Sequence, residues 1–516
     1  MNTIIFTTIV LIILIILIKL LIFSKTQNKN KIKKPPSPTS LPILGHLHLL
    51  INNKQPLYKT LTQLSINHGP IMLLRFGFRP VLIVSSFSAA TECFTNLDVI
   101  FANRPKLPAE GRLTYNHTTL GTSSYGPHWR NIRRIVTVHL FSSAKLNLSS
   151  TIRAAETHAL VRRLFKGGSE FKRVDMRTVL HEMVLNVMMM LVAGKRYYVD
   201  EGVLNADVDE VKWFEEMVEE TFKFSGISNA RDFLPEFFRV VDVHGVEKKL
   251  ARLEKMWDEY LQRLIDELRG KLGQENHDDN ESIIRINLIG TLLAMQEDED
   301  PDYYTDNLIK AQVLSLLSAG SHTASGTLEW GLSLLLNHPQ VLRKARDEID
   351  ELVGHDRLIK EFDIPNLPYL HCIVLEVLRL YPTTPLLLPH ESSQDCNVSG
   401  FDIPRGTVLV VNAYAMHRDP EIWEDALMFK PERFLGGEEE GKKMMPFGMG
   451  RRRCPAEAFS FRVVELVLGA LVQCFEWERV EDVEVDMEGG PGLDMRKAIP
   501  LELMCKTSSR FNWCYF

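Results

Sequence analysis

The sequence has few cysteines, and they form no recognisable framework. Its seven cysteines are scattered among 516 residues and are odd in number. They lack the close, repeated spacing of a disulfide-rich secreted domain or a zinc ribbon. We therefore expect a reducing compartment, and any functional cysteine has to be found from the residues around it.

A strong excess of charge of one sign is also absent. The 60 lysines and arginines nearly balance the 66 aspartates and glutamates, which gives a formal net charge of −6. Proteins that bind nucleic acid usually carry a basic patch, so we expect no nucleic-acid partner. The 45% of hydrophobic and 24% of charged residues are typical of a globular protein with a large core.

One long hydrophobic run opens the chain. Only Thr7, Thr8 and Lys19 interrupt the apolar residues between positions 4 and 23, and a helix of that length spans a hydrocarbon layer of about 30 Å. The run is too long for a signal peptide and lacks a basic start and a small-residue cleavage site. We expect a transmembrane anchor over residues 1–24, and the lysines that follow favour a cytosolic position for the rest of the chain.

A short hinge and one large domain are expected after the anchor. Residues 25–45 are basic and then rich in proline, which enforces an extended backbone. In residues 46–516, short β-branched runs at 71–76 and 81–84 predict a small sheet, and most of the remainder has helical periodicity. The sequence therefore predicts a mainly α domain with small β-sheets, without internal repeats.

The segment PFGMGRRRCPAEAF carries the strongest chemical signal. Gly448 and Gly450 permit a tight loop, and Pro455 suits the first position of the apolar helix that follows. We expect Cys454 at the N-cap, where the helix dipole and the arginines at 451–453 would stabilise a thiolate. Such a thiolate is a nucleophile or a metal ligand, whereas a buried structural cysteine would need none of these neighbours.

These residues carry a resemblance to a known family. Phe447, Gly450, Arg452 and Cys454 match the haem-binding pattern F-x-x-G-x-R-x-C of cytochrome P450 monooxygenases. Further motifs of that family follow in the right order along essentially the whole chain: W-x-x-x-R at Trp129 and Arg133, E-x-x-R at Glu376 and Arg379, and FKPERF with Arg433. The anchor and the proline hinge resemble those of the microsomal members.

The resemblance implies the cytochrome P450 fold and haem b with Cys454 as the axial ligand. It implies that NADPH supplies electrons through a reductase, and that Phe447 covers the sulfur while Gly450 lets the backbone approach the porphyrin. Buried carboxylates need donors, and the expected donors to the haem propionates are Trp129, Arg133, His390 and Arg452, with an ordinary loop histidine as the alternative for His390. Glu376, Arg379 and Arg433 should form a structural network behind the haem.

A long helix from a cap at Thr305 to Leu336 should cross the other face of the haem. Its segment AGSHTA resembles the family's A-G-x-[D/E]-T-[T/S] oxygen-binding motif. Gly320 would leave room for dioxygen. The Thr323 hydroxyl could compete for the carbonyl of Ala319, open the helix locally and deliver protons.

Two positions of this motif depart from the family pattern. His322 stands at the acidic position and Ala324 at the following hydroxyl position. A histidine titrates near neutrality, so His322 could carry the protons in place of an acid. Alternatively, His322 only satisfies a buried hydrogen bond, and the relay runs through Thr323 and water. An unusual relay also leaves room for an oxidation of a phenolic or alkaloid substrate that ends in ring closure or coupling instead of oxygen insertion.

The finer resemblance is to the plant branch that contains isoflavone hydroxylases and methylenedioxy-bridge-forming enzymes. It implies a small, lipophilic, mostly aromatic substrate, a position in the endoplasmic reticulum membrane with a single span, and contact with membrane lipid and the reductase. Asp494 stands where the branch commonly has a neutral residue, and either meets an amine or hydroxyl or is a solvated loop carboxylate. Substrate contacts are expected from residues 105–120, 213–224, 314–318, 383–388 and 493–495.

Two other functions remain open at this point. A haem-thiolate isomerase or dehydratase would need no external electrons, and the retained A-G-x-x-T pattern argues against it. A membrane haem sensor would need no open distal site. Product formation that depends on NADPH separates the monooxygenase from both.

Overall fold

The structure is a computed structural model that describes residues 33–51, 55–166, 168–198, 208–224, 230–234, 245–272 and 287–513. The predicted anchor over residues 1–24 lies outside the described residues. Among those described, the helix α9 (Met176–Ala193) is long and apolar enough to span a membrane. Most of α9 is buried inside the protein, so it belongs to the core.

The described elements follow the predicted pattern of many helices and few strands. The helices are α2 (His48–Ile51), α3 (Leu57–His68), α4 (Phe87–Phe94), α5 (Pro108–Leu113), α6 (Pro127–His139), α7 (Ser143–Leu148), α8 (Ser150–Phe165), α9, α10 (Val208–Phe224), α12 (Val246–Leu272), α14 (Leu288–Asp298), α15 (Asp306–Asn337), α16 (Pro339–Leu352), α17 (Pro368–Leu380), α18 (Ala413–Met416), α19 (Glu438–Gly441) and α20 (Glu457–Cys474). Short 3-10 turns are η1 (Ile100–Ala102), η3 (Ala230–Phe233), η4 (Ile364–Asn366), η5 (Pro431–Phe434) and η6 (Gly450–Arg452).

The strands form small sheets at the edges of the helical body. One sheet has the order β1 (Ile71–Phe76), β2 (Arg79–Val84), β7 (Val408–Val411) and β4 (His390–Glu391), with β2 and β7 parallel. A second has the order β3 (Lys172–Asp175), β9 (Glu502–Thr507) and β8 (Phe475–Arg479), and β5 (Cys396–Val398) pairs with β6 (Phe401–Ile403). The mainly α fold with small sheets is confirmed, and the first two strands lie where the sequence places them.

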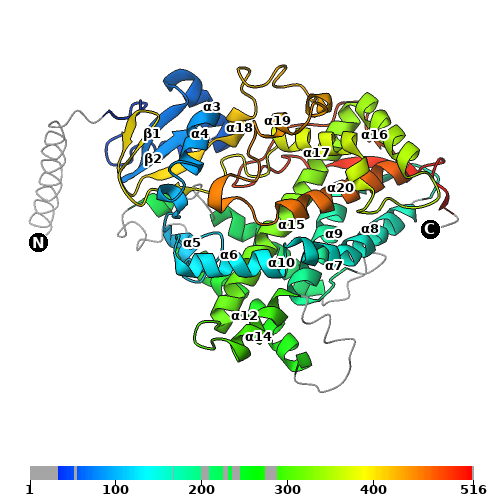
Figure 1. Ribbon diagram of the computed structural model, residues 1–516, viewed down its shortest axis with the longest axis horizontal. Helices are drawn as coiled ribbons and strands as arrows, with labels where there is room; N and C mark the ends of the chain where they lie inside the picture. Colours follow the sequence, from blue (N-terminus) through cyan, green and yellow to red (C-terminus); the bar gives the residue numbers. More distant parts are fainter. Residues whose placement is uncertain are drawn as a thin grey trace, which may run out of the picture.

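The helix α15 crosses the middle of the molecule and organises the core (Figure 1). The Thr305 hydroxyl caps it by accepting a hydrogen bond from the Leu308 amide at 3.3 Å. It ends at Asn337, one residue beyond the predicted Leu336. It packs most extensively against α9 and also against α20, α17 and α12. A helix that is apolar on nearly every side has to be buried in this way.

Candidate active site

A cavity of about 300 Å³ lies between α15 and the loop that precedes α20. Its wall brings together eight of the residues singled out from the sequence: Trp129, Arg133, Gly320, Thr323, His390, Phe447, Arg452 and Cys454. These residues come from four separate segments of the chain, so their convergence is a property of the fold. Gly450 and His322 do not line this cavity.

Cys454 is not at the N-cap of α20, so that expectation was wrong. Pro455 and Ala456 form a turn after Cys454, and the helix begins at Glu457 with Ala456 as its N-cap. The amide of Cys454 donates to the Phe447 carbonyl at 2.9 Å, which closes the loop. Burial raises the pKa of the Cys454 thiol, although an Ala456 backbone hydrogen bond and the charge of Arg133 oppose the rise. Burial therefore favours the neutral thiol in the protein alone, and a bound metal cation would favour the thiolate.

The three consecutive arginines serve three different purposes. Arg451 forms an ion pair with Asp98 at 2.8 Å. Arg453 forms an ion pair with Glu457, in which its Nη2 donates to Oε1 at 2.7 Å. Arg452 alone lines the cavity. Because Arg451 and Arg453 are neutralised by acidic partners, only Arg452 of this run contributes a positive charge to the cavity wall.

The cationic wall of the cavity fits a ligand with carboxylates. Burial and the charges of Arg104 and Arg133 lower the pKa of Arg452 to about 8, and burial lowers the pKa of Arg104 to about 10. Arg104 and Arg452 donate to backbone carbonyls, and within the described residues neither has an ion pair with a carboxylate. The indole Nε1 of Trp129 is buried without a partner among the described residues. These buried donors match the need of the two propionates of haem.

His390 and Arg104 modify the predicted donor set. The His390 ring shares a 2.6 Å hydrogen bond with the Phe101 carbonyl while also lining the cavity, and burial holds its pKa well below the usual range. Arg104 is not among the donors expected from the sequence, although the basic residue in the segment ANRPK was the available signal. Both belong to the same buried wall as Arg452.

Gly450 is required for a different reason from the one expected. With φ at +70°, a Cβ on Gly450 would lie 2.4 Å from the carbonyl oxygen of Phe94 in α4. No L side chain fits there without displacing the backbone. Of the two glycines of this loop, Gly448 lines the cavity. Gly450 therefore fixes the loop against α4 and does not face the cavity.

A buried ionic network supports the loop from behind. Both oxygens of Glu376 accept hydrogen bonds from Arg379, at 2.7 and 2.8 Å, and Arg433 donates to the same carboxylate at 3.1 Å. Arg379 also donates to the His417 carbonyl at 2.6 Å, and the His417 ring accepts from the Met445 amide at 3.0 Å. Met445 directly precedes the segment that carries Cys454, so the network is linked to that loop by two hydrogen bonds in series.

On the opposite wall, Thr323 is placed as the sequence indicated. Its hydroxyl donates to the Ala319 carbonyl at 2.7 Å, and both residues line the cavity. The expected local opening of the helix is not observed, because α15 is continuous through this position. A Cβ on Gly320 would lie 2.4 Å from Cε of Met188, so this glycine allows α9 and α15 to approach beside the cavity.

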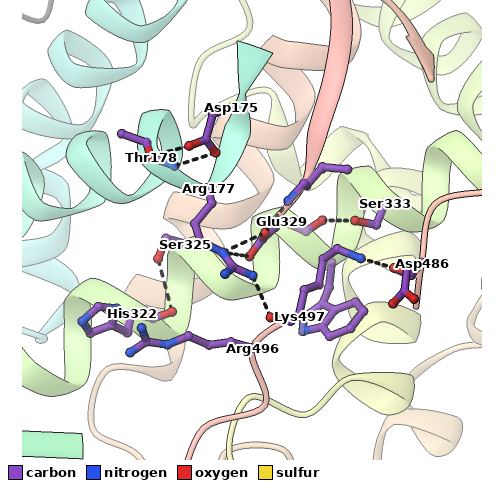
Figure 2. A network of polar contacts seen from close by, with 12 residues as sticks. Asp175, Arg177, Thr178, His322, Ser325, Glu329, Ser333, Asp486, Arg496 and Lys497 are labelled. Carbon is purple, nitrogen blue, oxygen red and sulfur yellow. Dashed lines mark hydrogen bonds and ion pairs between the residues drawn. The ribbon is translucent and has the colours of Figure 1, made fainter. Parts of the chain in front are cut away.

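His322 points to another face of α15. Its ring stacks on that of His181 in α9, with centroids 4.6 Å apart and planes inclined by 17°. Figure 2 shows His322 and Arg496 on the same side of the helix. Burial and the nearby His181 hold the pKa of His322 well below the usual range. A neutral ring away from the cavity does not support the proton-carrying role considered for His322.

The expected substrate contacts are found in part. The lining includes Leu120 from the first predicted segment and residues from the segments at 314–318, 383–388 and 493–495. Among the residues of the predicted segment 213–224 whose side chains the structure describes, none lines the cavity, because α10 packs against α12 and α5. Apart from the cationic wall the lining is mostly apolar, which suits a lipophilic guest.

Comparisons with known proteins agree with this geometry. The family model of cytochrome P450 matches residues 35–498. "Cytochrome P450 81Q32" of Catharanthus roseus is 46% identical, with 98% of this chain and 97% of the relative covered. The isoflavone 3′-hydroxylase of Medicago truncatula is 44% identical, with 94% and 95% covered. The (+)-piperitol/(+)-sesamin synthase of Sesamum radiatum is 43% identical, with 94% and 93% covered.

The fold comparison points the same way. A solved structure of a zebrafish cytochrome P450 with progesterone superposes with a TM-score of 0.73 at 27% identity, and covers 88% of this chain and 100% of that chain. The similarity therefore extends through the helical body and is not confined to the cysteine loop.

Proposed function

The chain belongs to the cytochrome P450 family, and from this premise we propose that it hydroxylates a small, lipophilic, mainly aromatic plant metabolite. Members of this family are oxidoreductases that hold haem through a cysteine thiolate and receive electrons from NADPH through a reductase. When bound, haem supplies the activation of dioxygen. The observation that carries the proposal is that Cys454 and Thr323 line opposite walls of one cavity.

The roles of the site residues follow from their positions. Cys454 would supply the thiolate that binds the haem iron, and Phe447 would cover the sulfur. The donors to the haem carboxylates would be Arg133, Arg452, His390 and Trp129, joined by Arg104. The Thr323 hydroxyl donates its proton to the Ala319 carbonyl and lines the cavity, so it would turn away from that carbonyl to donate a proton into the cavity and would take up a replacement proton from water. Gly320 leaves room for Met188 of α9 beside the cavity, and His322 packs against His181 of the same helix.

Hydroxylation of a phenolic or isoflavonoid compound is the leading reaction. Support comes from the relatives named isoflavone hydroxylases. Oxidative ring closure is the second candidate, and a relative named (+)-piperitol/(+)-sesamin synthase favours it. An isomerase or dehydratase without external electrons remains the third, because the cavity by itself would also hold a peroxide substrate.

The proposal is tested with microsomes that contain the protein and a plant reductase. A library of isoflavones, other phenolics and alkaloids is supplied with NADPH under isotopically labelled dioxygen. A product that carries the label and requires NADPH supports hydroxylation. A product that requires NADPH but gains no oxygen indicates ring closure, and a product formed without NADPH contradicts the monooxygenase.

We also propose that residues 1–24 form a single membrane anchor, residues 25–45 a hinge and residues 46–516 a catalytic domain on the cytosolic face of the endoplasmic reticulum. The sequons at Asn116, Asn147, Asn280 and Asn397 provide a test, since lumenal sequons would be glycosylated. Glycosidase should leave the mobility of protein from eukaryotic cells unchanged. A mobility shift would show the opposite orientation.

A further inference from the structure

One carboxylate lines a cavity whose other charged residues are all basic. Among the lining residues, Asp494 is the single acid, and only 13% of its side chain is exposed. A loop carboxylate with no function is normally solvated, because burying it costs free energy. Its position in the wall therefore separates the two interpretations that the sequence left open, and favours a functional one.

The residue that follows Asp494 is fixed through both its amide and its carbonyl. The amide of Met495 donates to the Thr383 carbonyl at 2.8 Å, and the indole of Trp330 in α15 donates to the Met495 carbonyl at 2.7 Å. Bonds to the backbone on both sides of this residue hold its neighbour Asp494 in a defined place at the cavity wall.

A second set of contacts, shown in Figure 2, holds the backbone further along the same segment. Arg177 of α9 donates to the Lys497 carbonyl at 2.8 Å and is paired with Glu329 of α15 at 3.1 Å. Glu329, which is almost fully buried, also accepts from the Leu501 amide at 2.9 Å. The backbone that follows Asp494 is thus tied to α15 and α9. A binding group held on such a support loses little freedom when it meets a ligand.

The charge of Asp494 is already compensated. Its carboxylate forms an ion pair with Arg496, two residues further along. A carboxylate has about four lone-pair sites, so pairing with one guanidinium leaves acceptor capacity. Because Arg496 balances the negative charge, a neutral donor fits this site better than a second cation does. A hydroxyl is such a donor.

We propose that Asp494, held by Arg496, accepts a hydrogen bond from a free hydroxyl group of the substrate. The inference rests on the proposed monooxygenase function and names its substrate class. The substrate is a neutral aromatic compound that carries at least one free hydroxyl away from the position that is oxidised. Asp494 thereby sets specificity for the free hydroxyl over its methyl ether, which offers no donor and adds a methyl group.

The test uses ligands that bind independently of the natural substrate. Phenylimidazoles with a hydroxyl at the ortho, meta or para position are each compared with the methyl ether of the same isomer. The imidazole nitrogen ligates haem iron, so each dissociation constant is read from the shift of the Soret band. We expect at least one hydroxyl isomer to bind wild-type protein about tenfold more tightly than its methyl ether, the factor for one well-placed hydrogen bond of about 1.4 kcal/mol.

The variants are Asp494→Leu, Asp494→Asn and, as the matched control, Asp482→Leu. Asp482 is an exposed acid of the same C-terminal segment and does not line the cavity. Asp494→Leu should bring the ratio of the two dissociation constants close to one, Asp494→Asn should keep part of it because the amide oxygen still accepts, and Asp482→Leu should leave it unchanged.

The outcomes that would overturn the inference are distinct from those against the proposed function. A wild-type ratio near one for all three isomers, or a ratio that survives in Asp494→Leu, rules out recognition by Asp494. The carbon monoxide spectrum of each protein is recorded first. If the wild type lacks the thiolate Soret band, the proposed function fails, and the inference fails with it.

Discussion

The two walls of the cavity differ in how the chain builds them. The Cys454 wall comes largely from one contiguous segment, and its loop is closed by a backbone hydrogen bond and supported by a buried ionic network. The opposite wall combines α15 with Asp494 from a distant segment. The first wall carries the chemistry that all family members share. The second carries the departures at Ala324 and Asp494, whereas His322 lies on the same helix but faces α9.

One residue along a helix changes the surroundings of a side chain completely. Thr323 faces the cavity, whereas the preceding His322 stacks on α9. Successive residues of an α-helix are rotated by about 100°, so adjacent positions of one motif need not share a site. A motif match therefore predicts which residues share a site more reliably for the contiguous Cys454 loop than for the helix α15.

The largest effect is expected from breaking the support of the Cys454 wall. Arg379→Leu leaves the fully buried Glu376 without its main partner. Removing one member of a buried pair costs about 3 to 5 kcal/mol, so little folded, carbon monoxide-binding protein should accumulate. Urea unfolding and the yield of that protein provide the measurement.

Arg510→Gln is the matched control for this variant. Arg510 is 55% exposed and contacts Asp350 at 3.1 Å. An exposed ion pair contributes about 0 to 1 kcal/mol, so the control should fold normally. Equal stability of the two variants would show that the network does not support this wall.

A smaller effect, on coupling alone, is expected at Thr323. Thr323→Ala removes the hydroxyl that lines the cavity, so the product formed per NADPH should fall about tenfold or more, with peroxide released instead. Thr323→Ser should keep most of the coupling. Ser321→Ala is the control, because Ser321 makes the same kind of bond, to the Leu317 carbonyl at 2.7 Å, but does not line the cavity. Coupling lost equally in both alanine variants would refute the role of Thr323.

A still smaller effect, on the pH dependence of stability, is expected from His181. Burial lowers the pKa of His181 to about 4 from an ordinary 6.5, so the folded protein holds this ring neutral. The contribution of this neutral ring to the free energy of unfolding is complete above about pH 6.5. It is lost as the pH falls toward 4, at up to about 1.4 kcal/mol per pH unit. Urea midpoints between pH 7 and 5 should fall less steeply in His181→Gln than in the wild type, while substitution of the exposed His355 by Gln should leave the slope unchanged. Identical slopes in all three would contradict the burial argument.

The smallest effect is expected for His322 itself. If its neutral ring only packs against His181, His322→Gln should change the ratio of product to NADPH by less than about twofold at every pH from 6 to 8. A ratio that depends on pH in the wild type and collapses in this variant would restore the proton-carrying role.

The sequence predicted the mainly α fold, the first strands and the bounds of α15 because long periodic runs and caps are local signals. It also named most of the Cys454 wall, since those residues are close together in the chain. It misplaced the N-cap of α20, because a two-residue turn at Pro455 and Ala456 resembles a helix start. It missed Arg104 and left the role of Asp494 open, because only tertiary packing decides whether these side chains face the cavity or solvent.

The most direct test of the central claim is the reduced carbon monoxide spectrum of the wild type and of Cys454→Ser. A serine hydroxyl cannot provide a soft anionic ligand at neutral pH. The wild type should show the Soret band of a haem-thiolate protein, and the variant should lack it. If that band persists in Cys454→Ser, another residue is the ligand and this account of the cavity is contradicted.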